Sequence, residues 1–170
     1  MNKKPISAVA AIGVNRAIGK GNDLLWDLPK DLKRFTELTK GNVVIMGRKT
    51  WESLPAKHRP LKDRHNIIIT KQDNFEAEGA FVAANFFKAL QEAQTYANRN
   101  DCEIFIIGGG QIYDLALPYT DTLYLTVVDD EPKADVFFPP FDEGFTLTEA
   151  EDDEDSGYQI SFRTYKRRAL

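Results

Sequence analysis

Two short runs of apolar side chains without a polar interruption most constrain how this chain can fold. They are Ile67-Ile68-Ile69 and Ile104-Phe105-Ile106-Ile107. A strand with one face in water alternates apolar and polar residues, whereas a parallel strand covered on both faces is apolar throughout. We therefore predict that both runs are central strands of a parallel sheet.

Further strand candidates alternate with helical patterns along the chain. Strands are predicted at residues 6–14, 42–46, 66–70, 80–83, 104–107, 123–128 and 158–165. Helices are predicted at residues 28–39, in a short segment after Gly47, from an Asn85 cap through Asn98, and at residues 111–117. The last strand alternates in polarity, which is typical of a half-exposed antiparallel strand. The pattern predicts one α/β domain over residues 1–170, with a mostly parallel central sheet, an antiparallel C-terminal strand and flanking helices. Ligands of such sheets usually bind at the carboxyl ends of the strands.

The composition is ordinary for a globular protein, with 42% hydrophobic and 28% charged residues in 170. No apolar run approaches the roughly 20 residues of a membrane-spanning helix, so we predict no membrane partner. The short segment before the first strand predicts no signal peptide. Cys102 is the only cysteine, which excludes an intrachain disulfide and favours a cytoplasmic protein.

The net charge of −4 comes from one acidic stretch. Six carboxylates lie between Glu149 and Asp155, and acidic and basic residues are nearly balanced elsewhere. We predict a solvated, exposed loop there. Because no basic stripe is interleaved with aromatic residues, we predict no nucleic-acid partner.

Asp31 stands where the first predicted helix should be apolar. Helical spacing gives an apolar stripe of Leu28, Leu32, Phe35 and Leu38 around Asp31, and an outer face of Lys30, Lys33, Arg34 and Glu37. A carboxylate among apolar neighbours has a raised pKa and needs a partner, which a ligand could supply. The alternative is an acidic residue that only complements the helix dipole, after an Asp27 N-cap and Pro29 in the first turn.

Glycine follows two predicted strands immediately before a helix. Gly47-Arg48-Lys49-Thr50 places two cations and a hydroxyl at a helix start, which favours phosphate binding over a merely solvated helix end. Gly108-Gly109-Gly110 contains more glycine than a tight turn needs, and it allows an unusual peptide conformation or close approach to a flat ring or a pyrophosphate. The second junction is not the G-x-G-x-x-G fingerprint, so an ordinary Rossmann domain is disfavoured.

Thr70 and Lys71 follow the apolar run Ile67-Ile68-Ile69. A classical NAD site often has an acidic residue near the ribose, where it would repel a 2′-phosphate. A hydroxyl and a cation therefore favour NADPH over NADH if a dinucleotide binds. Lys71 taken alone is more often an ordinary surface lysine.

In this order, the motifs resemble the dihydrofolate reductase family, in its monomeric chromosomal bacterial form, over nearly the whole chain. The matching segments are Ala10-Ala11-Ile12-Gly13 with Ile18-Gly19, residues 24–35, 44–53 and 60–64, Ile107-Gly108-Gly109-Gly110 with Tyr113, and Leu125-Thr126. The resemblance implies an NADPH-dependent reductase that converts 7,8-dihydrofolate to 5,6,7,8-tetrahydrofolate. It also implies a monomer that binds antifolate inhibitors.

The resemblance further implies roles for individual residues. The implied catalytic set is Asp31, Thr126 and Trp26; Asp31 would bind the pterin N3 and 2-amino groups and assist protonation at N5. Arg64 would clamp the glutamate α-carboxylate of the substrate, with Arg59 as the competing candidate. The implied walls around the substrate rings are Leu32, Phe35, Leu54 and Leu61. The implied nicotinamide contacts are Ala11, Ile18, Gly19 and Leu24. The implied phosphate contacts are Arg48, Lys49, Thr50, Gly109, Gly110 and Gln111. A cis peptide is implied between Gly108 and Gly109.

The stretch Gly19-Lys20-Gly21-Asn22-Asp23 resembles the mobile lid of the family, and we expect it to close over the site. The chain departs from the family pattern at three places. Leu25 replaces a usual proline, residues 55–62 form a slightly longer stretch, and Lys71 and Gln111 replace residues that often hold the 2′-phosphate.

Two other functions fit part of the sequence. A pyrimidine reductase of riboflavin synthesis shares the fold and NADPH, but its substrate has no glutamate tail for Arg64. A non-catalytic nucleotide-binding module would use both glycine junctions but leaves Asp31 unexplained. His58 and His65 lack the spacing of metal ligands, and we predict surface or structural roles for them.

Overall fold

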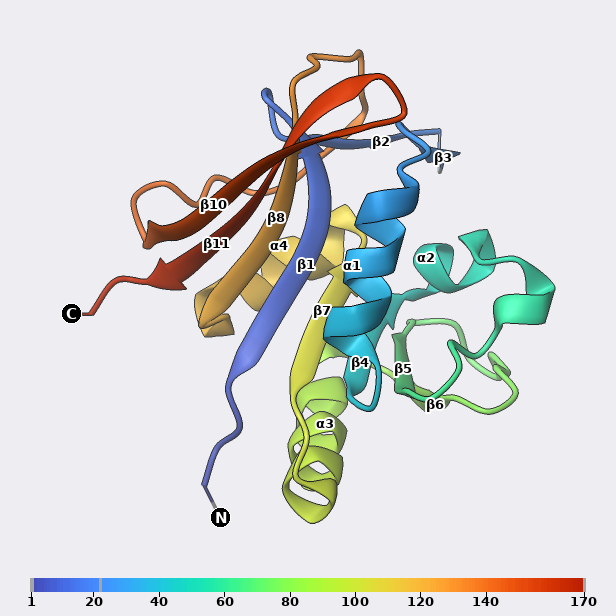
Figure 1. The fold of residues 1–170 in the computed structure, drawn as a ribbon. Coiled ribbons are helices and arrows are strands. Elements are labelled where there is room, and N and C mark those ends of the chain that lie inside the picture. Colours follow the sequence, from blue (N-terminus) through green and yellow to red (C-terminus); the bar gives the residue numbers. More distant parts are fainter. Residues whose placement is uncertain (1, 22, 170) are drawn as a thin grey trace.

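An eight-stranded sheet forms the centre of the computed structural model, which describes residues 2–21 and 23–169 (Figure 1). Its strands lie in the order β10-β11-β8-β1-β7-β4-β5-β6. Their bounds are β1 (Ile6–Gly13), β4 (Val43–Gly47), β5 (His65–Ile69), β6 (Phe81–Ala83), β7 (Ile104–Gly108), β8 (Thr122–Val128), β10 (Phe145–Asp155) and β11 (Tyr158–Arg167). All neighbouring pairs from β8 to β6 are parallel, whereas β11 is antiparallel to both β8 and β10. The predicted α/β architecture, with a mostly parallel sheet and an antiparallel last strand, is confirmed.

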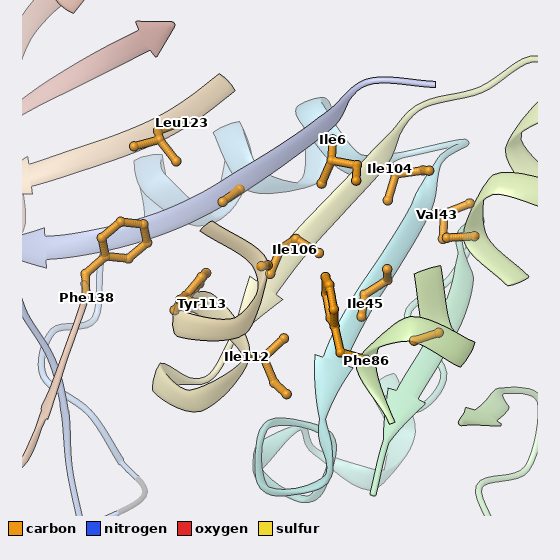
Figure 2. Close-up of a cluster of buried hydrophobic side chains, with 14 of the residues drawn as sticks. Ile6, Val43, Ile45, Phe86, Ile104, Ile106, Ile112, Tyr113, Leu123 and Phe138 are labelled. Atoms are coloured by element: carbon orange, nitrogen blue, oxygen red, sulfur yellow. The ribbon is translucent and has the colours of Figure 1, made fainter. Parts of the chain in front are cut away.

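Helices cover both faces of the sheet. The helices are α1 (Pro29–Thr39), α2 (Arg48–Ser53), α3 (Phe86–Asn100) and α4 (Gly110–Ala116), with short 3-10 turns η1 (Ala56–His58) and η2 (Leu117–Tyr119). Phe86 of α3 and Ile112 of α4 pack on one face, against the strand side chains shown in Figure 2. Phe35 and the buried Trp51, from α1 and α2, pack on the other face, and α1 lies in front of the sheet in Figure 1. This double coverage is the reason that the runs Ile67–Ile69 of β5 and Ile104–Ile107 of β7 are apolar.

The Asn85 cap of α3 is confirmed. The Asn85 side chain accepts a hydrogen bond from the Lys88 backbone N–H at 2.9 Å, as an N-cap residue does. The helix runs to Asn100, two residues beyond the predicted end, and Asp101 then takes a left-handed conformation with φ of 49°. In the described part of the chain, no helix is both long and apolar enough to cross a membrane.

A second, three-stranded sheet was not predicted. It contains β2 (Ala17–Lys20), β3 (Asp23–Leu24) and β9 (Val136–Phe137), in the order β3-β2-β9. Of the stretch that resembles a lid, Gly19 and Lys20 lie in β2, Gly21 is in a turn and Asp23 lies in β3, while Asn22 is outside the described residues. Closure of the lid stays a prediction.

The prediction of an acidic loop was wrong in conformation. Residues 149–155 belong to β10, the edge strand of the large sheet, which pairs with β11 along ten registered positions. Most of its side chains are exposed, and charged side chains are common on edge strands. A tight turn joins the two strands, with φ of 52° at Ser156 and 85° at Gly157.

The start and the buried face of α1 also differ from the prediction. Leu28, not Asp27, is the N-cap residue, and no side chain of its own segment caps the helix. Pro29 occupies the first turn as predicted. Leu32 is 64% exposed, whereas the predicted outer residue Arg34 is half-buried against the sheet. The helix is therefore rotated about its axis relative to the prediction. Asp31 and Arg34 face the sheet, whereas Leu32, which was predicted to face it, is exposed.

Candidate active site

Asp31 lies in the first turn of α1, half-buried against β8. Thr126 Oγ1 on β8 donates a hydrogen bond to Asp31 Oδ1 at 2.6 Å, so the structure brings the two predicted partners together. Burial raises the pKa of the Asp31 carboxyl, the Thr126 bond and the nearby Arg34 charge lower it, and the Asp155 charge raises it. Burial is the largest of these effects. Asp31 therefore holds a proton at higher pH than an exposed aspartate.

Arg34 supplies the only cation of α1 that acts on the Asp31 pKa, although the sequence had placed it on the outer face. Its guanidinium carbon lies 5.0 Å from the ring centre of Phe162 and 5.7 Å from that of Tyr124. Aromatic faces attract a guanidinium, and the apolar stem of arginine packs well beneath its charge. These contacts explain how an arginine occupies the sheet-facing side of the helix.

Trp26 anchors the segment that leads into α1. Its indole Nε1–H donates to Asp130 Oδ2 at 2.9 Å, just beyond β8. Its ring packs in the cluster formed by Leu28, Val128 and Ile160. These contacts hold the start of α1 against the end of β8, and the predicted catalytic role of Trp26 stays a prediction.

Tyr113 ties α4 to the central strand β1. Its buried hydroxyl donates to the Val9 carbonyl oxygen at 2.6 Å. Burial raises the pKa of this phenol, and the negative charge of Asp31 raises it further. Tyr113 is therefore a neutral hydrogen-bond donor that positions the start of α4.

Replacement of Tyr113 by phenylalanine is expected to lower the free energy of unfolding by about 1–3 kcal/mol, because the buried Val9 carbonyl loses its donor. Urea unfolding of both proteins measures the difference. Tyr119→Phe is the matched control, since Tyr119 is 38% exposed. Equal losses in the two variants would contradict a special role for the Tyr113 hydroxyl.

The two glycine junctions lie side by side at the carboxyl edge of the sheet. β4 and β7 pair in parallel with Met46 opposite Gly108, and β5 pairs with β4 so that Ile69 lies opposite Gly47. Consequently the segments after β4, β5 and β7 share this edge. A side chain added at Gly109 would lie 3.5 Å from Thr50 Oγ1, which shows how closely the two helix starts approach.

The glycines of the second junction have distinct structural requirements. Gly108 has φ of 122°, and the predicted cis peptide between Gly108 and Gly109 is confirmed. A side chain at Gly110 would approach Val136 Cγ1 of β9 to 2.5 Å, closer than real contacts allow. The third glycine is thus needed for the close packing of β9 on the start of α4.

Cationic and polar side chains surround this edge. Arg48 forms an ion pair with Glu52 one turn along α2, while Lys49, Lys71 and Gln111 are exposed. Thr70 is buried, and its Oγ1 accepts from the Gln72 N–H at 3.1 Å. The predicted phosphate contacts therefore gather at one edge, although their predicted role is still a prediction.

Three of the predicted apolar wall residues belong to one cluster on the α1 face of the sheet. They are Phe35, Leu54 and Leu61, which pack around Trp51 and Met46. The fourth, Leu32, borders an open groove of about 510 Å³ with Lys33 and Thr36.

Two arginines flank this apolar cluster. Arg64 donates from Nη1 to Thr39 Oγ1 at 3.1 Å and from Nε to the Lys62 carbonyl at 2.9 Å, with its guanidinium 5.9 Å from the Phe35 ring. Burial lowers the pKa of the Arg64 guanidinium. Arg59 instead donates to the carbonyl groups of Leu54 and Glu52 in the segment after α2. Arg64 therefore lies beside the ring of Phe35 on α1, and its role as the carboxylate clamp stays a prediction.

The predicted nicotinamide contacts come from the strand edge and the smaller sheet. Ala11 lies in β1 and packs against the same buried cluster as Trp26. Ile18 and Gly19 lie in β2, and Leu24 in β3 is 87% exposed. Gly19 and Leu24 are registered partners in the β2–β3 pair. An apolar side chain as exposed as Leu24 is free to cover a ligand.

Residues outside this site have other structural roles. The His65 ring stacks on Tyr96 with centres 3.9 Å apart, and its Nε2 lies 3.2 Å from Glu92 Oε1. Burial raises the pKa of the Cys102 thiol, which makes it a poorer nucleophile. Within the described residues, no group of three or more histidine, cysteine, aspartate or glutamate side chains is placed to hold a metal ion.

The parallel sheet, the adjacent glycine junctions at its carboxyl edge and the half-buried Asp31 define an α/β protein with a candidate ligand site at the edge of its sheet. The model of the family "Dihydrofolate reductase" matches residues 5–167. The chain is 39% identical to dihydrofolate reductase of Bacillus subtilis, covering 96% of this chain and 95% of that protein. It is 40% identical to dihydrofolate reductase type 3 of Salmonella typhimurium, covering 96% and 98%. The structure of dihydrofolate reductase from Enterococcus faecalis complexed with NADP(H) and RAB-propyl superimposes with a TM-score of 0.84 at 30% identity, covering 97% of both chains. The chain therefore belongs to the dihydrofolate reductase family.

Proposed function

We propose that this protein catalyses the NADPH-dependent reduction of 7,8-dihydrofolate to 5,6,7,8-tetrahydrofolate, with hydride transfer to C6 and protonation at N5. The observation that carries the proposal is Asp31, half-buried on the sheet-facing side of α1 and bonded to Thr126 at 2.6 Å. A carboxylate in that position loses hydration and adds no apolar packing to the helix. Its second oxygen is suited to accept from the N3 and 2-amino groups of a pterin.

The residues at the carboxyl edge of the sheet fit a phosphorylated dinucleotide. Gly109 leaves open backbone beside Thr50, where an added side chain would contact the hydroxyl at 3.5 Å. Arg48, Lys49 and Lys71 supply positive charge at the ends of β4 and β5. We propose that Thr50, Gly109, Gly110 and Gln111 complete the phosphate contacts. NADPH, when bound, supplies the hydride.

The protein orients the reactants, excludes water from the site and supplies one proton. Phe35, Leu54 and Leu61 form an apolar wall that orients flat rings and excludes water. Asp31 holds a proton at higher pH than an exposed aspartate because burial raises its pKa. A single acid is sufficient because the reaction delivers one proton, to N5.

The loss of NADPH absorbance in the presence of dihydrofolate tests the proposal. The native protein is expected to consume NADPH only when both compounds are present, and to form tetrahydrofolate in equal amount. NADPH binding without oxidation would instead support a non-catalytic nucleotide-binding module. Turnover with a pyrimidine of riboflavin synthesis, but not with dihydrofolate, would support the alternative reductase.

Lys71→Glu tests the proposed preference for the 2′-phosphate. The variant is expected to raise KM for NADPH by about tenfold or more, since a charged hydrogen bond contributes about 1.5–3 kcal/mol, and to leave KM for NADH nearly unchanged. Steady-state kinetics with both cofactors measure the change. Lys3→Glu, which precedes β1 at the opposite end of the strands, controls for net charge. An equal effect of both variants would contradict a local contact.

We also propose that residues 1–170 act as one domain, in a cytoplasmic monomer that antifolates inhibit. A sedimentation measurement tests the monomer directly. Competition between an antifolate and dihydrofolate tests the shared site.

A further inference from the structure

A second buried carboxylate, Asp155, lies at the start of the helix that carries Asp31. Asp155 ends β10 and is only 6% exposed, unlike the other acidic side chains of that strand. Its Oδ2 accepts a hydrogen bond from the Lys30 backbone N–H at 2.9 Å and a longer one from the Asp31 N–H at 3.4 Å. Figure 1 shows the tip of the β10–β11 hairpin beside the first turn of α1.

These contacts replace a cap that the helix lacks. Lys30 and Asp31 are the second and third helical residues, and their N–H groups have no acceptor within the helix. A side chain at the N-cap position normally accepts from these groups, but Leu28 occupies it and has no polar atom. Asp155 therefore acts as the N-cap of α1, although it lies more than a hundred residues away in the sequence.

The hairpin turn holds Asp155 in this position. Asp155 pairs with Tyr158 across a two-residue turn at Ser156 and Gly157, both with positive φ. Ser156 Oγ lies 3.4 Å from the other carboxylate oxygen, Asp155 Oδ1. Because the turn is short, the carboxylate has little freedom to leave α1.

The same contacts place a negative charge next to Asp31. The titratable and charged groups that act on Asp31 come from two elements, Arg34 on α1 and Asp155 on β10. Thr126 on β8 contributes a hydrogen bond, and the phenol of Tyr113 on α4 is itself influenced by Asp31. Arg34 and Thr126 favour the ionised form of Asp31, whereas Asp155 favours the protonated form.

We propose that Asp155 is a positioning residue for Asp31: it fixes the first turn of α1 through two backbone N–H groups, and its charge helps Asp31 to keep the proton that N5 requires. The charge effect rests on the proposed function, whereas the capping role does not. Asp155 itself is buried at the tip of the hairpin, where its carboxylate contacts the backbone of α1.

Asp155→Asn separates the charge from the cap, because the amide oxygen still accepts from the Lys30 N–H. A titration of the Asp31 carboxyl carbon by NMR is expected to show its midpoint at lower pH than in the native protein. The rate of a single turnover is expected to equal that of the native protein below both midpoints, and to fall below it at higher pH. Asp155→Ser provides a second neutral variant with a short acceptor, should the amide prevent folding.

Asp155→Ala removes both the charge and the cap. Hydrogen exchange at the Lys30 and Asp31 amides is expected to accelerate in this variant and to stay slow in Asp155→Asn. Asp153→Asn is the matched control: Asp153 lies two residues earlier on β10, is bonded to Lys30 Nζ at 2.8 Å, and is more exposed. It changes net charge equally and is expected to leave both the Asp31 titration and the amide exchange unchanged.

The titration midpoint of Asp31 could be the same in Asp155→Asn, in Asp155→Ser and in the native protein. That result would overturn the proposed effect of the Asp155 charge on Asp31. Unchanged amide exchange in Asp155→Ala would overturn the capping role. Both measurements use the protein without substrate, so they decide these roles even if the native protein never oxidises NADPH with dihydrofolate. That last result would instead overturn the proposed function.

Discussion

Asp31→Asn is expected to lower the rate of dihydrofolate reduction by about 10²- to 10⁴-fold, the contribution typical of a positioned acid. Asparagine has nearly the shape of aspartate, and its amide oxygen can still accept from Thr126 Oγ1. The substitution therefore removes proton delivery with little change in packing. Pre-steady-state measurement of hydride transfer, at several pH values, isolates this step from product release. The residual rate is expected to rise as pH falls, since the proton must then come from solution.

Although Asp31→Asn is expected to lower the rate, it is expected to raise the stability of the protein at neutral pH. Burial holds the pKa of Asp31 above its value in the unfolded chain. The native protein therefore loses stability as pH rises from the unfolded pKa through the folded pKa, because the unfolded state releases the proton first. Asparagine does not ionise, so the variant should match the native protein in acid and exceed its stability at neutral pH. Thermal unfolding across this pH range measures the difference.

Asp27→Asn is the control for both measurements, because Asp27 is exposed and immediately precedes Leu28. It is expected to keep the native rate and the native dependence of stability on pH. A small loss of rate in Asp31→Asn, similar to that of Asp27→Asn, would contradict the proposed role of Asp31.

Features set by local burial could be predicted from the sequence. The apolar runs in β5 and β7 follow from coverage on both faces, which acts on every residue of a strand. Asp31 was recognisable because a charged residue interrupts a periodic apolar stripe. The glycine junctions after β4 and β7 were equally visible, since glycine marks close approach of the backbone.

Features set by distant pairing could not be predicted. Arg34 lies on the buried face of α1 because Tyr124 and Phe162 receive its guanidinium, and both rings come from strands far along the chain. The helix cap was assigned to Asp27 because a local carboxylate is the usual cap, yet Asp155 on β10 supplies it. One local signal was present for this strand: Ser156-Gly157 is a turn dipeptide, which indicates a hairpin at the end of the acidic stretch.

Arg64→Leu is expected to raise KM for dihydrofolate by roughly 30-fold or more, since loss of one partner of a hydrogen-bonded charge pair costs about 2 kcal/mol or more. Two of the five N–H donors of a guanidinium are used by Thr39 and the Lys62 carbonyl. In the described part of the chain, no protein acceptor is bonded to Nη2 of Arg64. That end is therefore available for the glutamate carboxylate, while Thr39 and Lys62 fix the direction in which it points.

The maximal rate of Arg64→Leu is expected to change much less than KM, because the glutamate tail is remote from C6 and N5. A substrate analogue without the glutamate should be reduced equally well by the native protein and by the variant. Arg59→Leu is the matched comparison, since the guanidinium of Arg59 donates to the carbonyl groups of Leu54 and Glu52. A rise in KM confined to Arg59→Leu would transfer the clamp to Arg59. An unchanged KM in both variants would show that neither arginine binds the glutamate, and that the slightly longer stretch before Arg64 holds the substrate in another way.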